Sequence, residues 1–355
     1  MAHFQGALPT QDLQFRFDNA SGVLTVDLSP SFARDLREAV QVIEMPTPDL
    51  EHNYVTRLRR AGYRFVPPDL LRLIESVRSG IYAPTAVVFN GLPFDPVVSA
   101  PAPTERPRDR KPSDLSENVL VLFASLLGEP YGLAGEGTKL VNDLIPTRED
   151  RDRLTGNGSE RRLGFHTENA AHRRLFLDHD LSPHALLLEG VVAPSNHPPR
   201  TLVANGRIAA AQLSAQDREI LRGPCVEIAL PLRQRRGADA LRAAPTPVLT
   251  GRPGAETVTA AYYGDMMQPV SKRAKKAIDA FEAALEAVAV GLTVKPGVLA
   301  YIPNTYTLHA RDAFTPAFDP QGRPSRWLQR VFLTARLDGF QIGKAHGGRI
   351  FELPE

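Results

Sequence analysis

The stretch KPGVLAYIPNTYTLHAR, residues 295–311, contains a turn, an apolar run, a second turn and a second β-prone run. Its Pro-Gly pair favours a turn, and the apolar run that follows favours a strand. Asn304 then marks a tight turn, which its side-chain amide can brace. The sequence therefore predicts strand, turn and strand here, with His309 at the start of the second strand.

Similar β-prone runs recur upstream and downstream of this stretch and are separated by Gly, Pro, Asn and Asp. They lie at residues 138–145, 160–166, 184–192, 200–204, 225–232, 257–263, 293–302, 305–309 and 326–337. Many short strands with turn signals are typical of a sandwich, a barrel or a jelly roll. We therefore expect a core made mainly of β-strands.

Helical patterns flank this core. Residues 14–27 predict a hairpin or strand pair before the first helix. Helices are expected over residues 29–46, 68–77, 113–127, 214–221 and 270–290. Ser113 or Ser116 would cap the third of them, and Ser214 the fourth. The expected fold class is α+β, with a mainly β core.

Composition excludes several classes of protein. Of the 355 residues, 43% are hydrophobic and 23% are charged, and the formal net charge is +2, so no nucleic-acid partner is expected. A single cysteine, Cys225, excludes an intramolecular disulfide, and its apolar neighbours predict a buried residue rather than a nucleophile. Neither a signal peptide nor a run of ~20 apolar residues is visible, so we expect a cytoplasmic protein with no membrane contact.

The segment LGFHTEN, residues 163–169, carries the first candidate metal ligands. His166 and Glu168 are two residues apart, so on an extended strand they lie on the same face. With His309 they form a set of two imidazoles and one carboxylate, which can hold iron(II) on one side and leave the other open. Zinc hydrolases use a similar set, although usually as His-Glu-x-x-His on a helix, which is absent here.

The segment RPSRWLQRVFL, residues 323–333, carries candidate anion ligands. On a strand, Arg326 and Arg330 share a face with Leu328. Guanidinium groups among apolar neighbours are costly to bury unless anions neutralise them, and a keto acid and an amino-acid carboxylate would do so. On an edge strand the two arginines would instead be solvated.

Three motifs together resemble a known family: His-Thr-Glu-Asn at 166–169, Asn-x-x-x-x-His-x-Arg at 304–311, and Arg-Trp-Leu-Gln-Arg at 326–330. They are similar to those of the clavaminate synthase-like group of iron(II)/2-oxoglutarate-dependent oxygenases, over roughly residues 115–338. Ala310 departs from the Gly that relatives often carry. The resemblance implies a double-stranded β-helix, or jelly roll, flanked by helices.

The resemblance also implies a domain plan and residue roles. A single oxygenase domain would span residues 1–355, with a flank at 1–115 and a core at 116–340 that carries insertions at 146–160 and 233–256. The iron(II) ligands would be His166, Glu168 and His309. Arg326, supported by Thr201, would bind the distal carboxylate of 2-oxoglutarate. Arg330 would bind the substrate carboxylate, and no catalytic side chain is expected beyond the metal centre.

The expected substrate is a free L-amino acid of specialised metabolism, such as antibiotic biosynthesis. Glu168, which related halogenases lack, favours hydroxylation with dioxygen and could also accept a hydrogen bond from the substrate amine. Asp265 could pair with a guanidinium or ammonium group and so favours arginine, lysine or a derivative; otherwise it is a turn or capping residue. Asn142 and Asp143 are weaker pocket candidates.

Several alternatives stay open at this stage. The loops at 146–160 and 233–256 are either solvated surface or lids that keep water from the reaction. The substrate could be neutral or carrier-bound, and the reaction a desaturation or an oxidative cyclisation. A non-catalytic jelly-roll binding protein would leave the intact ligand set and the arginines unexplained.

Overall fold

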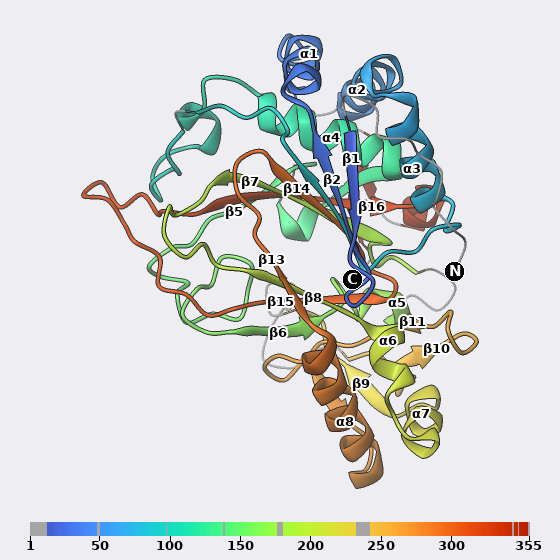
Figure 1. Ribbon diagram of the computed structural model, residues 1–355. Helices are drawn as coiled ribbons and strands as arrows, with labels where there is room; N and C mark the ends of the chain where they lie inside the picture. The colour runs from blue at the N-terminus through green and yellow to red at the C-terminus, as the bar shows by residue number, and fades with distance from the viewer. Residues whose placement is uncertain are drawn as a thin grey trace.

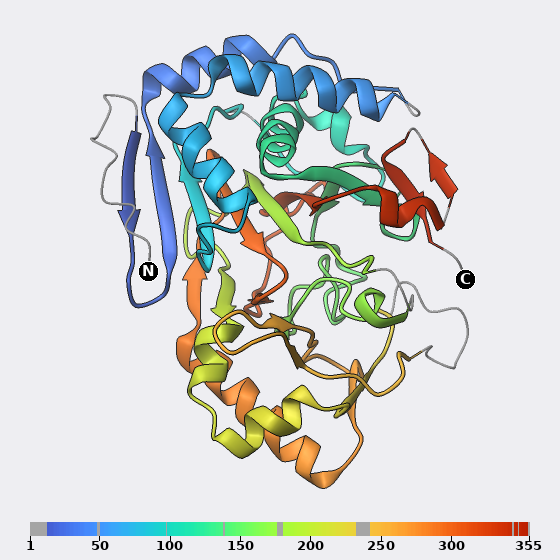
Figure 2. The ribbon, with the colours of Figure 1, turned by 90° about the vertical axis from the view of Figure 1, so that its right-hand side faces the viewer.

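The computed structural model describes residues 13–47, 50–96, 98–137, 139–175, 180–231, 242–342, 344–346 and 348–353. Two large β-sheets face each other, and helices cover the outer side of each (Figure 1). In the perpendicular view the N-terminal helices lie above the sheets and α8 below them (Figure 2). The expected jelly roll with helical flanks is confirmed.

The larger sheet has ten strands, and β16 lies in its interior. In spatial order the strands are β1 (Leu13–Phe17), β2 (Val23–Leu28), β3 (Ala86–Asn90), β14 (Val298–Pro303), β7 (Ala185–Val192), β16 (Trp327–Thr334), β4 (Glu129–Leu133), β18 (Ile350–Glu352) and β17 (Lys344–His346), and β5 (Asn142–Leu144) also pairs with β16. Because β16 pairs with β7 on one side and with β4 and β5 on the other, the edge-strand alternative is wrong.

The smaller sheet has four strands, in the order β13 (Val290–Leu292), β8 (Thr201–Asn205), β15 (Thr307–Arg311) and β6 (Leu163–His166). Beside it lie two strand pairs, β9 (Val226–Ile228) with β12 (Met267–Pro269) and β10 (Leu249–Thr250) with β11 (Thr257–Val258). Helices α6 (Gly206–Ala211), α7 (Ala215–Arg222) and α8 (Lys272–Val288) cover its outer face. Phe281 and Leu285 of α8 are fully buried there.

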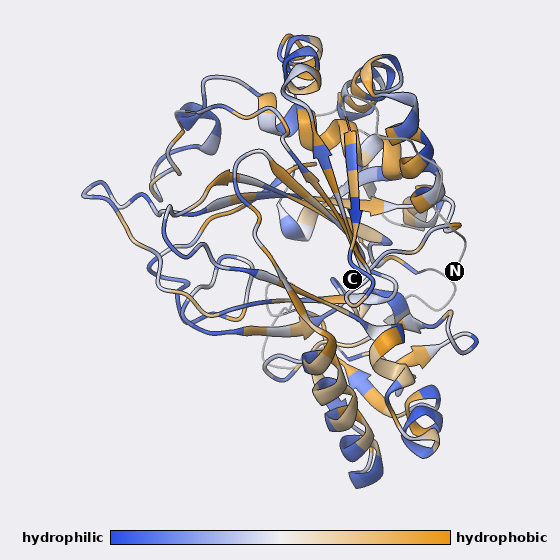
Figure 3. Ribbon diagram, in the orientation of Figure 1, coloured by the Kyte–Doolittle hydropathy of each residue, from blue (hydrophilic) through white to orange (hydrophobic). Residues whose placement is uncertain are grey.

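The N-terminal helices are α1 (Pro30–Val40), α2 (Glu51–Phe65), α3 (Pro68–Arg78) and α4 (Leu115–Leu127). All but one of the α4 residues are buried, which explains why this helix is apolar on nearly every side. Hydrophobic colour follows β7, β14 and β16, whereas the outward turns of α8 are hydrophilic (Figure 3). Shorter helical segments are η1 (Pro107–Arg110), η2 (Ala134–Glu136), α5 (His172–Leu175) and η4 (Asp338–Ile342).

Most predicted elements are present, with instructive differences. The Ser29 and Ser214 side chains cap α1 and α7 as N-cap residues. Helix α1 ends at Val40, before Pro46, because Asn118 of α4 donates from Nδ2 to the carbonyls of Val40 and Ile43, at 2.9 and 2.7 Å. The sequence prediction missed the helices α2, α5 and α6 and the strands β3, β4, β10, β12, β13, β17 and β18. Cys225 is buried, as predicted.

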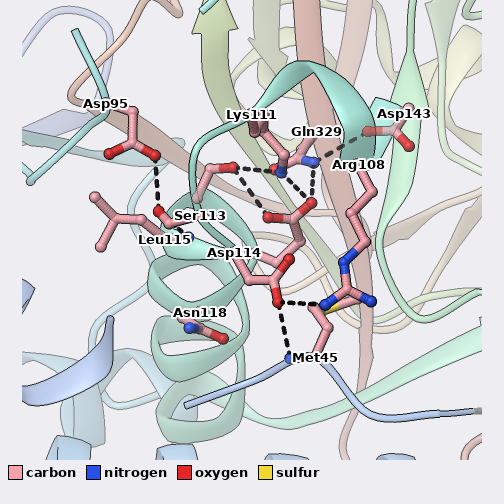
Figure 4. A network of polar contacts seen from close by, with 12 residues as sticks. Met45, Asp95, Arg108, Lys111, Ser113, Asp114, Leu115, Asn118, Asp143 and Gln329 are labelled. Atoms are coloured by element: carbon pink, nitrogen blue, oxygen red, sulfur yellow. Dashed lines mark hydrogen bonds and ion pairs between the residues drawn. The ribbon is translucent and has the colours of Figure 1, made fainter. Parts of the chain in front are cut away.

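A buried polar network lies between α4 and β16 (Figure 4). Gln329 of β16 donates from Nε2 to Glu117 at 2.9 Å and to Asp143 at 3.0 Å, and Lys111 pairs with Glu117. Glu189 of β7 is the cross-strand neighbour of Gln329 and is fully buried. Neither Glu189 oxygen, nor Oε1 of Gln329, has a hydrogen-bond partner among the described residues.

This network predicts a pH-dependent stability. Burial, with Glu117 nearby, raises the pKa of Glu189 well above its usual range. The folded protein therefore keeps a proton on Glu189 that the unfolded chain releases near pH ~4.3. Protonated Glu189 contributes fully to the stability of the fold below that pH. This contribution is lost as the pH rises toward the pKa of Glu189 in the folded state. We expect Glu189→Gln to melt at or above the wild-type temperature at pH 8, with a smaller difference at pH 5, in thermal scans.

Glu129→Gln is the matched control for Glu189→Gln. Arg59 and Arg349 contact Glu129 at 2.9 Å each. Burial raises the pKa of this half-buried carboxyl, but the hydrogen bond from Arg59 and the charges of both arginines outweigh burial and lower the pKa overall. The charged Glu129 carboxylate therefore contributes to the stability of the fold at pH values above its unfolded pKa. Replacing it with glutamine should lower the melting temperature at pH 8. Equal destabilisation by Glu189→Gln at both pH values would contradict a neutral Glu189.

No helix in the described part of the chain is long and apolar enough to cross a bilayer.

Candidate active site

Three candidate metal ligands meet between the two sheets. His166 ends β6 and is the cross-strand partner of His309 in β15, with ring centroids 4.1 Å apart. Glu168 follows two residues later, and its Oε2 lies 3.6 Å from Nε2 of His309. One ligand atom from each residue lies within 4.8 Å of the others, and all three side chains are buried. His309 is the middle residue of β15 rather than its start, because pairing with β8 begins at Thr307.

Asn304 positions the metal motif rather than its own turn. Its Oδ1 accepts from the Glu168 amide at 2.6 Å, and its Nδ2 donates to the carbonyls of Glu168 at 3.1 Å and Pro183 at 2.8 Å. Asn169 then turns the chain with a φ of 51°, a left-handed conformation that Asn tolerates better than most residues. The corner between β14 and β15 therefore holds Glu168 beside His309.

The orientation of His166 suits metal binding. Its Nδ1 lies 2.9 Å from the Gly164 carbonyl, so Nδ1 donates a hydrogen and Nε2 keeps a lone pair. Gly164 is required here, because a Cβ would stand 1.9 Å from the Tyr262 carbonyl oxygen. Two imidazoles and one carboxylate in this buried arrangement fit iron(II) with open positions for reactants.

One cavity contains the metal candidates together with Arg326 and Arg330. Arg326 precedes β16, is buried, and forms no ion pair among the described residues. Burial, together with the charge of Arg311, lowers the pKa of Arg326 to about 9. Because an unpaired buried guanidinium is costly, this side chain fits a bound anion. Thr201 of β8 lines the same cavity.

Arg330 has partners that the sequence did not indicate. Its Nη1 donates to Oε2 of Glu168 and its Nη2 to Oε2 of Glu136, both at 2.8 Å. All three side chains are buried. Arg330 therefore connects a candidate metal ligand to a carboxylate of η2 and still borders the cavity.

The structure does not bring Asp265 into this cavity. Its side chain is 55% exposed, and Oδ2 lies 3.5 Å from Nη2 of Arg242, which also donates to the Asp265 carbonyl at 2.9 Å. Asn142 is buried and neighbours Arg330 across the strands, without lining the cavity. Asp143 points to the other side of β16, where it accepts from Trp327 and Gln329. None of these three residues lines the cavity.

The two candidate lids differ. Leu154, Thr155 and Gly156 of loop 146–160 line the cavity, which supports a covering role for that loop. In the second loop, residues 233–241 lie outside the described residues, and the remainder contains the short strand β10.

Three residues at or beside the cavity received no role from the sequence. Tyr263 lines the cavity with its ring 5.1 Å from that of His166. Glu136 lies in a Gly-rich turn that gives no chemical signal. The sequence did carry a signal for Arg311. This residue stands two positions after His309 and so points to the same side of the strand, toward the cavity.

Comparison with known proteins agrees with this geometry. A family model described as taurine catabolism dioxygenase TauD, TfdA family, matches residues 110–332. L-asparagine oxygenase of Streptomyces coelicolor is 28% identical over 318 residues, 82% of this chain and 86% of the relative. Clavaminate synthase 2 of Streptomyces clavuligerus is 26% identical over 340 residues, 91% of this chain and 96% of the relative.

A solved structure shows the same fold. It is asparagine oxygenase in complex with Fe(II), (2S,3S)-3-hydroxyasparagine and succinate, with a TM-score of 0.80, 26% identity, and coverage of 93% of this chain and 99% of that one. The resemblance read from the motifs is confirmed. This chain belongs to the TauD/TfdA family of iron(II)- and 2-oxoglutarate-dependent oxygenases.

Proposed function

We propose that this chain hydroxylates an unactivated C–H bond of a free L-amino acid. The observation that carries the proposal is one buried cavity that combines His166, Glu168 and His309 with Arg326 and Arg330. Iron(II) supplies the redox chemistry that activates dioxygen. In the balanced reaction one oxygen atom enters the C–H bond and the other enters succinate, while 2-oxoglutarate loses carbon dioxide.

The side chains divide the cavity into two anion sites. Arg326, with Thr201, binds the distal carboxylate of 2-oxoglutarate. Arg330 stands four residues later along β16, roughly 13 Å away for an extended strand, and binds the amino-acid carboxylate. Glu168, which contacts Arg330, offers a carboxylate oxygen to the substrate ammonium group, and Glu136 holds the other end of the Arg330 guanidinium. Two anchored carboxylates place the C–H bond beside the metal ligands.

The lining favours an uncharged substrate side chain. Glu168 is the single carboxylate residue among the described residues that border the cavity, and it already belongs to the metal set. Leu154, Thr155 and Tyr263 offer apolar surface and hydroxyl groups instead. Asparagine is the amino acid named for the relative from Streptomyces coelicolor. A basic side chain remains the alternative, and it requires Asp265 to leave Arg242.

A panel of L-amino acids tests this proposal. With iron(II), 2-oxoglutarate and dioxygen, we expect asparagine or glutamine to raise succinate formation at least about tenfold above the rate with arginine or lysine, because an unpaired cation would enter the site desolvated. Mass spectrometry would detect succinate and a product heavier by one oxygen atom.

The opposite order of rates would favour the basic substrate and the role predicted for Asp265. In that case Asp265→Asn should remove the preference, whereas it should leave turnover of a neutral amino acid unchanged. Absence of amino-acid-dependent succinate throughout a wider panel would contradict the proposed function itself.

A further inference from the structure

Arg311 is a third buried guanidinium in the metal cavity, beside Arg326 and Arg330. It ends β15, is the cross-strand neighbour of Thr201, and lies on the same side of the strand as His309. It is 6% exposed and forms no ion pair among the described residues, since Asp312 pairs with Arg200. Burial lowers the pKa of Arg311 to about 10, although Asp312 opposes this shift.

The guanidinium of Arg311 holds the base of loop 146–160. Its Nη1 donates to the carbonyl of Ser159 at 3.0 Å, and its Nη2 to the carbonyl of Arg161 at 3.1 Å. The Ser159 amide in turn donates to the Arg151 carbonyl at 3.0 Å, which closes the loop on itself. Arg311 is therefore attached to the same segment that places Leu154, Thr155 and Gly156 on the cavity.

Phe314 joins this anchor to Arg326. The Phe314 ring centroid lies 5.5 Å from the guanidinium carbon of Arg311 and 5.1 Å from that of Arg326. The Phe314 amide also donates to the Ser159 carbonyl, at 2.9 Å. Two like charges thus share one aromatic ring in a buried site, where their repulsion is poorly screened.

We propose that Arg311 is a positioning residue that couples the keto-acid end of the cavity to loop 146–160. A dianion held by Arg326 offsets the repulsion between the two guanidinium groups and so stabilises Arg311 in its bonds to the loop base. The loop then covers the amino-acid end of the cavity. This inference rests on the proposed function, because it takes 2-oxoglutarate as the dianion.

Coupling of this kind works in both directions. If the keto acid stabilises the covering loop, a loop held in place must also raise the affinity for the keto acid, by the same factor. Couplings of this sort are typically about 5–150-fold. The amino acid, which contacts the covered end, should therefore bind more tightly after 2-oxoglutarate than before it.

Limited trypsin digestion without oxygen tests the proposal directly. Arg148, Arg151 and Arg153 are exposed in the loop and provide cleavage sites that peptide mass mapping can follow. In the wild type, iron(II) with 2-oxoglutarate should slow cleavage at these sites at least about fivefold, at the low end of such couplings. The visible absorption band of the iron–keto acid chelate reports binding independently.

Arg311→Lys is the decisive variant. It keeps the charge but cannot donate in a fork to two carbonyls, so it should form the chelate band and yet lose the protection of the loop. Its KM for the amino acid should rise about tenfold, a loss comparable to one charged hydrogen bond, with a smaller change in kcat. Arg200→Lys, at the exposed Arg200–Asp312 pair, is the matched control and should behave like the wild type.

The digestion and the chelate band together distinguish the coupling from the proposed function. Full protection in Arg311→Lys, or a wild type that forms the band without any protection, would overturn the coupling and leave the proposed function standing. A wild type that forms no band would remove the proposed function and this inference with it. If Arg311→Lys folds poorly, Phe314→Leu removes the shared ring while both charges remain, and it should lose protection in the same way.

Discussion

Replacing His166 and His309 together with alanine is expected to abolish amino-acid-dependent succinate formation and the absorption band of the iron(II)–keto acid chelate. The double variant keeps a single ligand, Glu168, of the three that lie within 4.8 Å of one another. Loss of an outer partner of a metal ligand typically costs 10–100-fold, so loss of two ligands should exceed about a hundredfold. Anaerobic titration with iron(II) and 2-oxoglutarate measures the band, and succinate assays measure turnover.

Two controls keep this test specific. His52→Ala removes an exposed imidazole from α2 and should leave the band and the turnover unchanged. Circular dichroism should show that the double variant still folds, because both sheets retain their backbone pairing. Persistence of the chelate band in the folded double variant would show that the metal binds elsewhere.

Arg330→Leu is expected to lower kcat/KM for the amino acid by about 10- to 150-fold, while the chelate band stays intact. The range follows from losing a charge-assisted hydrogen bond of about 1.5–3 kcal/mol to the substrate carboxylate. Arg326, which we assign to the keto acid, is unchanged in this variant. Steady-state kinetics with each reactant varied in turn would separate the two carboxylate sites.

The same variant should also lose stability. Removing Arg330 leaves the buried carboxylates of Glu168 and Glu136 without their 2.8 Å partner, which typically costs about 3–5 kcal/mol. Adding iron(II) should recover part of the lost melting temperature, because the ion replaces the positive charge of Arg330 beside Glu168. Melting scans with and without the metal measure this difference.

Arg330→Leu/Glu136→Leu provides the matched comparison. The double variant also removes the Glu136 carboxylate that Arg330 contacted, so it should regain stability relative to Arg330→Leu without regaining affinity for the amino acid. A purely structural role for Arg330 would give the opposite result, with activity returning as stability returns. An unchanged KM for the amino acid in Arg330→Leu would contradict the substrate-carboxylate role.

Which residues face the cavity was predictable from local periodicity. His166 and Glu168 are two residues apart, as are Arg326 and Leu328, and extended backbone sends such pairs to one side. Their spacing therefore predicted a common face before any partner was known. The helix ends were less predictable, as α1 shows, because Asn118 sets its end from 78 residues away.

Asp265 shows what a local pattern leaves undecided. Its place after a β-prone run suggested a pocket carboxylate, but Arg242 holds it at the surface. Nothing in the local pattern distinguishes a turn that points inward from one that points outward, because the direction depends on the loop packed beside it.

The sequence by itself determined the ligand types, their common faces and the family, since these depend on residue identity and a two-residue repeat. The tertiary structure alone decided which charges meet. It paired Arg330 with Glu168 and Glu136, tied Asn304 to the Glu168 backbone, and set Arg311 beside Arg326. These contacts join strands of two different sheets or distant loops, and their partners are fixed by how the sheets pack rather than by any local pattern.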